Sequence, residues 1–189
     1  MPFTGAAMSD DFLSFLPKTF VALDLETTGL DSQRHQIIEV GAIKFTIGQM
    51  QHAGKNCLIK IDRKVPPFIS RLTGITSEML ETGGYQLEEV LDSVIEFIED
   101  LNLVAFNAAF DLRFLNSALR RSGRPVITNS HSCVLDMARR AWPHMSSFRL
   151  IDLARAGGQR TEGAHRAMKD CELAIHVYLA AARTLRSVR

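Results

Sequence analysis

The stretch FVALDLETTGLD, residues 20–31, begins as an apolar run of strand length and then carries two acids, Asp24 and Glu26. Its apolar start, Phe20–Asp24, predicts a strand buried in the centre of a sheet. Because side chains alternate along a strand, the two carboxylates fall on the same face, roughly 7 Å apart. Burying an ionised carboxylate without a partner costs several kcal/mol, so the strand predicts a cation beside it. If the strand instead ends by Leu25, both acids lie in a solvated loop.

The length and composition of the chain restrict its class. Its 189 residues suffice for one domain with a sizeable core, and 46% apolar with 23% charged residues excludes disordered, collagen-like and membrane classes. The N-terminus lacks the basic start and apolar core of a secretory signal. Three widely spaced cysteines without C-x-x-C spacing favour a reducing, cytoplasmic setting. We expect an N-terminal extension at 1–17 and one domain at 18–183.

The net charge of +1 hides an uneven distribution. Residues 1–111 hold 8 Lys and Arg against 16 Asp and Glu, a net of −8, whereas residues 112–189 hold 14 against 5, a net of +9. In one interpretation the two parts interleave in space and the asymmetry has no function. In the other, a basic surface faces a polyanion beside an acidic pocket.

Hydrophobic periodicity predicts three early strands. Residues 36–50 alternate well enough for strand structure on either side of a turn near 47–49, and residues 55–61 follow as another strand. With the opening stretch, these segments predict an antiparallel meander. The segment 65–84, with two prolines near its start and two glycines at its end, is expected to be loop and short helix.

The second part of the chain predicts mainly helices. A short apolar run at 103–106 predicts a strand, and one more strand is expected near Arg124–Ile127. Helices are expected at 87–100, 107–123, Ser132–Ala141, 146–158 and Ala167–Arg186. This order predicts an α/β fold with a mixed five-stranded sheet, three antiparallel strands and then parallel ones, covered by helices on both faces.

Two further polar groups stand near element ends. Asn107 and Asp111 lie where the 103–106 strand meets a helix, and alone they favour a helix cap and a first-turn charge. His165 and Asp170 face one point only if His165 lies in the loop before the last helix. Taken together, four carboxylates and a histidine from three segments predict a site at the sheet edge where such folds bind ligands.

The chemistry of this donor set indicates a hard cation. Carboxylate oxygens suit Mg²⁺ or Mn²⁺, whereas zinc prefers His and Cys. Four negative charges roughly balance two divalent ions, which is the arrangement used for in-line attack on a phosphodiester. The residues therefore predict a site for two Mg²⁺ or Mn²⁺ ions.

Three motifs carry a resemblance to a known family: D-L-E-T-T-G at 24–29, N-x-x-F-D at 107–111 and H-x-x-x-x-D at 165–170. They resemble the exonuclease motifs of the DEDDh 3′→5′ exonucleases, also called DnaQ-like after the proofreading epsilon subunit of bacterial DNA polymerase III. Further matching stretches are IIEVGAIKF at 37–45, RLTGIT at 71–76, LVAFNAAFDLRFLN at 103–116 and MARRAWP at 137–143. The resemblance covers about residues 18–182.

This resemblance implies a ribonuclease H-like fold and stepwise hydrolysis of a nucleic acid from its 3′ end, releasing nucleoside 5′-monophosphates. Asp24, Glu26, Asp111 and Asp170 match the family's metal ligands, and His165 matches its general base. One metal is expected to lower the pKa of a water, His165 to take its proton, and the second metal to stabilise the leaving 3′-oxygen. Because the base must be neutral, we hypothesise that the rate rises with pH through the neutral range.

The same resemblance implies contacts with the substrate. The turn 27–29 matches a turn that lies by the terminal nucleotide in the family. Leu72 and Ile75 match apolar residues that pack against the terminal bases. For the turn and for these two residues, the alternative is simple packing in the protein core. Phe106 stands where many relatives have His, and either stacks on a base or fills the strand. The substrate candidates are Thr27, Thr28, Gly29, Leu72, Ile75, Phe106 and Asn107. The candidates for phosphate contact are Arg120, Arg121, Arg139, Arg140, Arg166 and Lys169.

Three functions stay open on this evidence. The first is an active exonuclease on single-stranded DNA, either a proofreading subunit that binds a DNA polymerase or a free-standing enzyme. The second is a ribonuclease of the same family that trims RNA or short oligoribonucleotides, since no residue excludes a 2′-hydroxyl. The third is a non-catalytic module that binds nucleic acid or a polymerase, which would predict a lost ligand, whereas all five matched positions are intact.

Overall fold

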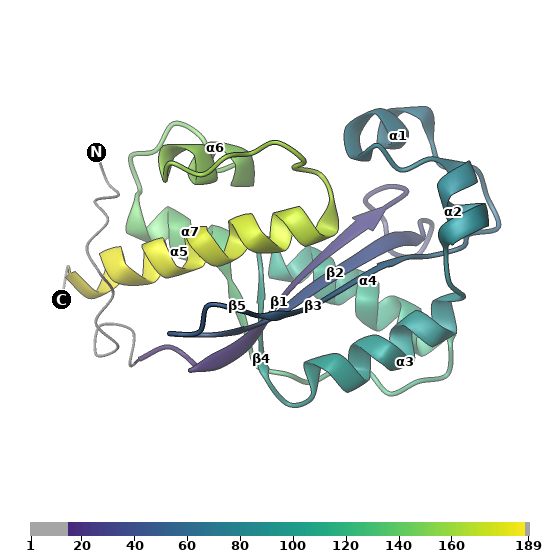
Figure 1. Cartoon of the computed structure of the whole chain (residues 1–189), viewed down its shortest axis with the longest axis horizontal. Coiled ribbons are helices and arrows are strands. Elements are labelled where there is room, and N and C mark those ends of the chain that lie inside the picture. Colours follow the sequence, from purple (N-terminus) through teal and green to yellow (C-terminus); the bar gives the residue numbers. More distant parts are fainter. Residues whose placement is uncertain (1–14, 188–189) are drawn as a thin grey trace.

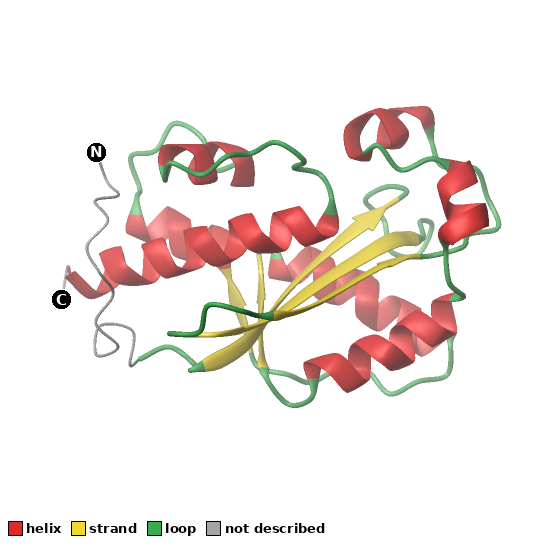
Figure 2. Ribbon diagram, viewed as in Figure 1, coloured by secondary structure: helices red, strands yellow, loops and turns green. Residues whose placement is uncertain are grey.

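The computed structural model describes residues 15–187, and its five-stranded sheet has the order β3-β2-β1-β4-β5 (Figures 1 and 2). The strands are β1 (Thr19–Thr27), β2 (Ile37–Thr46), β3 (Ala53–Leu58), β4 (Asn102–Ala105) and β5 (His131–Cys133). The pairs β1–β2 and β2–β3 are antiparallel, whereas β1–β4 and β4–β5 are parallel. The predicted mixed sheet, three antiparallel strands followed by parallel ones, is confirmed.

Helices cover both faces of this sheet. They are α1 (Pro67–Thr73), α2 (Ser77–Gly83), α3 (Leu87–Ile98), α4 (Ala108–Arg121), α5 (Val134–Ala141), α6 (Leu150–Ala156) and α7 (Ala167–Ser187). Figure 1 shows α5, α6 and α7 on one side of the sheet and α3 and α4 on the other. Within the described residues, no helix combines the length and apolar content that crossing a lipid bilayer requires.

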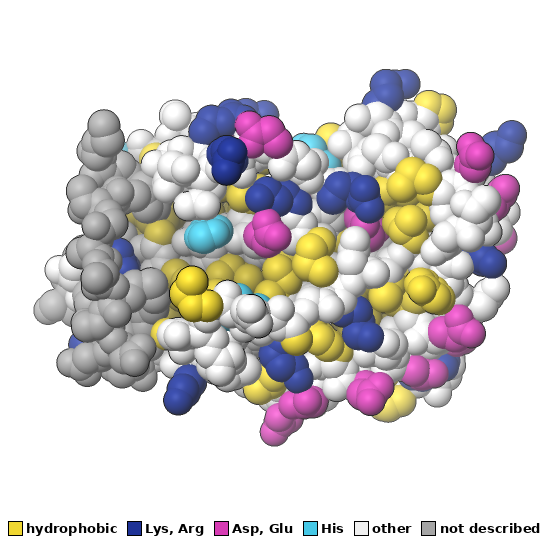
Figure 3. All heavy atoms as spheres, in the orientation of Figure 1, with side chains coloured by type: hydrophobic (Ala, Val, Ile, Leu, Met, Phe, Trp, Pro, Cys, Tyr) yellow, Lys and Arg dark blue, Asp and Glu magenta, His cyan; other side chains and the backbone are white. Residues whose placement is uncertain are grey.

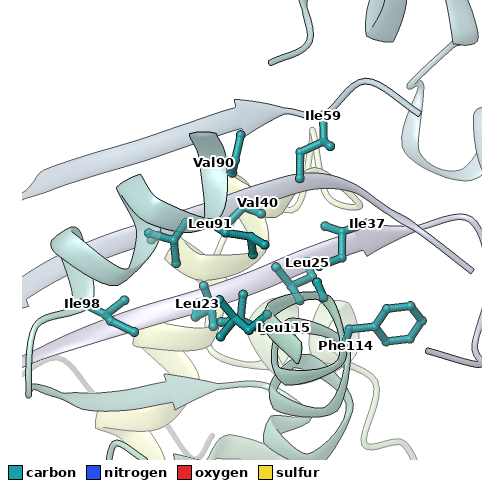
Figure 4. Packing of buried hydrophobic residues seen from close by; sticks show 14 of the residues in the cluster. Leu23, Leu25, Ile37, Val40, Ile59, Val90, Leu91, Ile98, Phe114 and Leu115 are labelled. Carbon is teal, nitrogen blue, oxygen red and sulfur yellow. The ribbon is translucent and has the colours of Figure 1, made fainter. Parts of the chain in front are cut away.

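Strand β1 supplies both cores because its side chains alternate between the two faces. Val21, Leu23 and Leu25 point into the cluster formed with α3 and α4, where Figure 4 shows Leu23 and Leu25 against Leu115. Phe20 and Ala22 point into the other cluster, formed with α5, α6 and α7. Because Asp24 and Glu26 continue this second series, they face the side of α7.

The fifth strand differs from the prediction. It lies at His131–Cys133 and pairs with β4, whereas the expected strand at Arg124–Ile127 is irregular. Pro125 lacks an amide hydrogen for a ladder, and Arg124 forms an ion pair with Asp92 on α3 instead. The helix predicted from Ser132 consequently begins two residues later, at Val134.

The first turn of α7 lies directly on β2. A Cβ atom on Gly41 would stand 2.4 Å from the carbonyl carbon of Ala167 and 2.6 Å from the nitrogen of Met168, so glycine permits this backbone approach. Gly41 pairs with Asp24 across the two strands, and directly opposed residues share a face. The close contact therefore brings the start of α7 beside the acidic positions of β1.

Candidate metal centre

Strand β1 continues through both acids. It ends at Thr27, so the alternative in which the strand stops by Leu25 and leaves the acids in a solvated loop is wrong. Pairing with β2 extends along the whole strand, but pairing with the parallel strand β4 stops at Ala22. The carboxyl-terminal half of β1 therefore has an open edge on the β4 side, beyond the end of the parallel pair.

Three carboxylates converge at this end of β1. Oxygen atoms of Asp24, Glu26 and Asp170 all lie within 4.8 Å of one another, and the three side chains are partly buried. Asp170 comes from the first turn of α7, where its backbone N–H donates to the carbonyl oxygen of Arg166 at 2.9 Å. Two segments that are far apart in the sequence thus form one acidic cluster.

Asp111 lies beside this cluster and is held by β1 itself. It is 3% exposed, and its Oδ1 accepts a hydrogen bond from the backbone N–H of Leu25 at 3.2 Å. That N–H is available because β4 has already ended. Asp111 is not within 4.8 Å of all three other carboxylates, but its charge raises the pKa values of Asp24 and Glu26. The structure therefore places it next to the triad, on the α4 side.

His165 lies in the loop before α7, which is the position from which it and Asp170 were predicted to face one point. Helix α7 begins at Ala167, and His165 has a left-handed backbone with φ of 64°. Its backbone N–H donates to Oδ1 of Asp170 at 3.2 Å, and this hydrogen bond partly opposes the burial that raises the pKa of that carboxyl group. The histidine and the carboxylate are thus joined in one turn that faces the end of β1.

Burial raises the pKa of four carboxyl groups at this site, those of Asp24, Glu26, Asp111 and Asp170. Desolvation is the largest cause in each case, and it raises the pKa of Glu26 and of Asp111 to about 8. The pKa of Asp24 is raised well above its ordinary value by burial and then by its acidic neighbours, led by Asp111. The pKa of Asp170 is also raised by burial.

These acids fit a divalent cation. Among residues 15–187, no Lys or Arg forms an ion pair with Asp24, Glu26 or Asp170, although the three oxygens converge. A bound cation reverses the electrostatic cost of bringing such groups together. The donors are all oxygen atoms, which matches Mg²⁺ or Mn²⁺ rather than a sulfur- and nitrogen-preferring zinc site.

A fifth acid, Glu39, was missed by the sequence argument. It is fully buried on β2, opposite Glu26, and Arg166 forms an ion pair with it at 2.7 Å. Its signal in the sequence was an acid inside the apolar run IIEVGAI, two residues before Gly41. Arg166 was expected to contact phosphate, but its guanidinium is already engaged by this carboxylate.

The turn at 27–29 is internally bonded. Thr27 Oγ1 donates to the carbonyl oxygen of Gly29 at 2.6 Å, and Thr28 Oγ1 accepts from the N–H of Gln36 at 3.0 Å. Both threonines are 7% exposed, and a Cβ on Gly29 would stand 2.4 Å from the ring of His35. These residues build the turn, and contact with a nucleotide stays a prediction for them.

The other substrate candidates divide by exposure. Leu72 is 49% exposed, whereas Ile75 is fully buried with Ile38 and Leu80 and has no surface for a base in this structure. Phe106 is partly buried against the α7-side core. Asn107 is exposed at the start of α4 and its side chain makes no capping hydrogen bond, so its amide remains available to a ligand.

The basic candidates divide in a similar way. Arg121 donates to the carbonyl oxygen of Ser32, and the other engaged side chains pair with nearby acids. These pairs are Arg139–Asp136, Lys169–Glu172 and Arg166–Glu39. Arg120 and Arg140 are exposed and form no ion pair within residues 15–187, and Arg120 lines a groove between α4 and the turn after β1. Figure 3 shows further basic side chains gathered over α6 and the start of α7.

Comparison with known proteins gives consistent matches. A family model described as exonuclease, of the RNase T type, matches residues 21–178. The chain is 31% identical over 166 residues to DNA polymerase III subunit epsilon of Aquifex aeolicus, covering 88% of this chain and 81% of that protein. It is 37% identical over 172 residues to the PolC-type DNA polymerase III of Thermotoga maritima, covering 91% of this chain but 12% of that protein.

Solved structures agree on the fold. The zinc-bound complex of Escherichia coli exonuclease I with single-stranded DNA superimposes with a TM-score of 0.76 at 22% identity. The match covers 91% of this chain and 41% of that one. At this identity the likeness shows the fold, which is the ribonuclease H-like arrangement of a mixed sheet between helical layers.

Proposed function

The chain belongs to the DnaQ-like family of 3′→5′ exonucleases, and from this premise we propose that it is a DEDDh-type enzyme that removes nucleotides from the 3′ end of single-stranded DNA. The observation that carries the proposal is the convergence of Asp24, Glu26 and Asp170 within 4.8 Å, with Asp111 and His165 beside them. In a nuclease family, this acidic cluster at the strand end is the place for phosphodiester hydrolysis.

The proposed cofactor is a pair of Mg²⁺ or Mn²⁺ ions. Asp24, Glu26 and Asp170 would hold them, with Asp111 from the α4 side. When bound, such ions supply Lewis-acid activation of water and charge stabilisation of the leaving oxygen. The fully buried Glu39 is not part of this set, because both of its oxygens accept hydrogen bonds from Arg166 or Ala167.

His165 is the proposed general base. The hydrogen bond between its backbone N–H and Asp170 fixes the turn that carries the imidazole, and a ring nitrogen would take the proton of the attacking water. The products are then a nucleoside 5′-monophosphate and a strand shortened by one nucleotide with a free 3′-hydroxyl. Asn107 and Leu72, both exposed, are the proposed contacts for the terminal nucleotide.

The choice of DNA rests on the relatives. Both sequence relatives described above are DNA polymerase III proteins, and exonuclease I has been solved with single-stranded DNA. A polymerase partner and a proofreading role are part of the proposal because these two relatives are named as DNA polymerase III proteins; the chain spans 81% of the first and 12% of the second. Trimming of RNA is the second candidate, since the described site contains no group that would reject a 2′-hydroxyl.

Matched 5′-labelled DNA and RNA single strands test the proposal. The protein is incubated with Mg²⁺ or Mn²⁺ beside EDTA, with Asp24→Asn as the site variant. Asp136→Asn is the control, because Asp136 is an exposed acid in a surface ion pair on α5. We expect a metal-dependent ladder that shortens from the 3′ end, survives in the control and disappears in Asp24→Asn.

The outcomes separate the three candidate functions. A faster ladder on DNA supports the proposal, and a faster ladder on RNA replaces it with an RNA-trimming enzyme. No ladder on either strand from folded protein with metal present refutes the enzyme and leaves a binding module.

A further inference from the structure

Glu39 is a charged side chain that the proposed reaction does not use. It is 0% exposed, and its carboxylate accepts from Arg166 Nε at 3.2 and 3.1 Å, from Arg166 Nη2 at 2.7 Å and from the backbone N–H of Ala167 at 3.0 Å. A buried carboxylate is costly unless it is paired and hydrogen-bonded, and within residues 15–187 its hydrogen bonds all come from two consecutive residues, Arg166 and Ala167. The Glu39 carboxylate therefore binds one short segment of the chain, Arg166 and Ala167.

That segment begins the turn that carries the catalytic candidates of α7. Arg166 directly follows His165, and its carbonyl oxygen accepts the N–H of Asp170. Asp170 in turn accepts the N–H of His165, so the turn closes on itself. His165 has φ of 64°, a left-handed conformation that a non-glycine residue adopts only when its surroundings hold it there.

Two contacts fix this turn to β2, and both lie on the face of the metal centre. Glu39 holds Arg166 and Ala167, and Gly41 admits the backbone of Ala167 to van der Waals distance. In the β1–β2 pair, Glu39 stands opposite Glu26 and Gly41 stands opposite Asp24. Strand β1, which carries Asp24 and Glu26, is thus paired with β2. Strand β2 in turn holds the turn that carries His165 and Asp170.

We infer that Glu39 and Arg166 act together as positioning residues, which set the place of His165 and Asp170 relative to Asp24 and Glu26. A guanidinium with two donors on one carboxylate fixes direction as well as distance, which a lysine in its place would not do. The pair also brings a positive charge beside Glu26, whereas Glu39 alone would add a fifth negative charge to the cluster. The inference rests on the proposed function, because it assigns roles within that site.

Two variants break the pair in different ways. Glu39→Gln keeps the shape of the side chain and leaves the Arg166 cation without its partner, next to Glu26. Arg166→Lys keeps the positive charge and removes the two-donor geometry. Because the Arg166 side chain is partly exposed, this variant tests the pair even if Glu39→Gln fails to fold. Arg124→Gln is the matched control, because it removes the Arg124–Asp92 ion pair, which joins the segment after α4 to α3.

The readouts are single-strand digestion and Mn²⁺ binding by calorimetry, measured well below the unfolding temperature. Partners that orient metal ligands typically contribute about 10–100-fold to metal affinity or activity. We expect kcat and Mn²⁺ affinity to fall by about that factor in Glu39→Gln and Arg166→Lys, with the KM for DNA unchanged and the control like the parent. The double variant Glu39→Gln, Arg166→Lys should lose no more activity than the more impaired of the two single variants, because the two residues act as a unit.

Other results would overturn the inference. If folded variants keep kcat and Mn²⁺ affinity within about twofold of the parent while only the unfolding temperature falls, the pair is structural. If the effects of the two substitutions simply add, the residues act separately. A parent protein without nuclease activity would instead refute the proposed function, and the Mn²⁺ titrations would still decide whether the pair orders the acidic turn.

Discussion

Removing divalent cations is expected to make the stability of this protein fall as pH rises through the neutral range. The folded state raises the pKa of Glu26 from its ordinary value of 4.5 to about 8, chiefly by burial. A carboxyl group of this kind is protonated in the folded protein but ionised in the unfolded chain. Its favourable contribution is therefore complete below the unfolded pKa and is lost as pH rises through the folded pKa.

The size of the effect follows from one proton. Between the two pKa values the unfolded state binds one proton fewer, so the free energy of unfolding falls by about 1.4 kcal/mol per pH unit. From about pH 5.5 to pH 7.5, Glu26 alone accounts for about 2.7 kcal/mol, or a decrease in Tm of about 5–10 °C for a chain of this length. Asp111 acts in the same direction, since its pKa is also raised to about 8.

The assay is thermal unfolding in EDTA and in excess Mg²⁺ across that pH range. Binding of the ionised carboxylates to the metal should remove most of the decrease, because a ligand at about 100 times its Kd adds about 2.7 kcal/mol. Glu26→Gln is the control that separates this group from the six histidines of the chain, and its metal-free profile should be flatter than that of the parent. A metal-free parent whose Tm stays constant or rises over this range would refute the buried-carboxylate reasoning.

Four further predictions concern packing and substrate contact. Gly41→Ala should lower stability by about 1–3 kcal/mol and weaken Mn²⁺ binding, because its Cβ would press on the backbone of Ala167; unchanged calorimetry and unfolding would contradict this. Ile75→Ala should cost about 2–5 kcal/mol in denaturant unfolding, as a fully buried side chain does. Leu72→Ala, at a half-exposed position, should change stability by less than about 0.5 kcal/mol and raise only the KM for DNA, and a large loss of stability would show that Leu72 is a core residue. Arg120→Gln should reduce the slope of log Kd against log salt by about 0.7, and an unchanged slope would exclude a phosphate contact.

The sequence predicted most of the fold because its elements have clear local periods. The amphipathic pattern of α3 and the apolar start of β1 are visible without any tertiary information. The fifth strand was misplaced because three residues are too few to show a period, and His131–Cys133 forms a strand only through its parallel partner β4. Ile75 was assigned to the substrate by resemblance, whereas packing against Ile38 puts it in the core.

The chemistry of the candidate site was also predictable, but its arrangement was not. Residue types alone indicated oxygen ligands for a hard cation, and motif spacing indicated which segments carry them. That Asp111 reaches the site by capping the N–H of Leu25 depends on where β4 ends relative to β1. The sequence also left Arg166 among the phosphate contacts, because its partner Glu39 lies 127 positions away.

The sequence by itself determined the donor atoms, the order of strands and helices, and the alternation that puts Asp24 and Glu26 on one face. Each of these follows from covalent neighbours and from the repeat of a strand or helix. Only the tertiary structure decided that Asp170 joins these two acids within 4.8 Å, and that a fully buried Glu39 holds the turn that brings it there. These contacts arise from strand pairing and close backbone packing between segments that are distant in the sequence. No local sequence pattern indicates which distant residue will lie beside a given side chain.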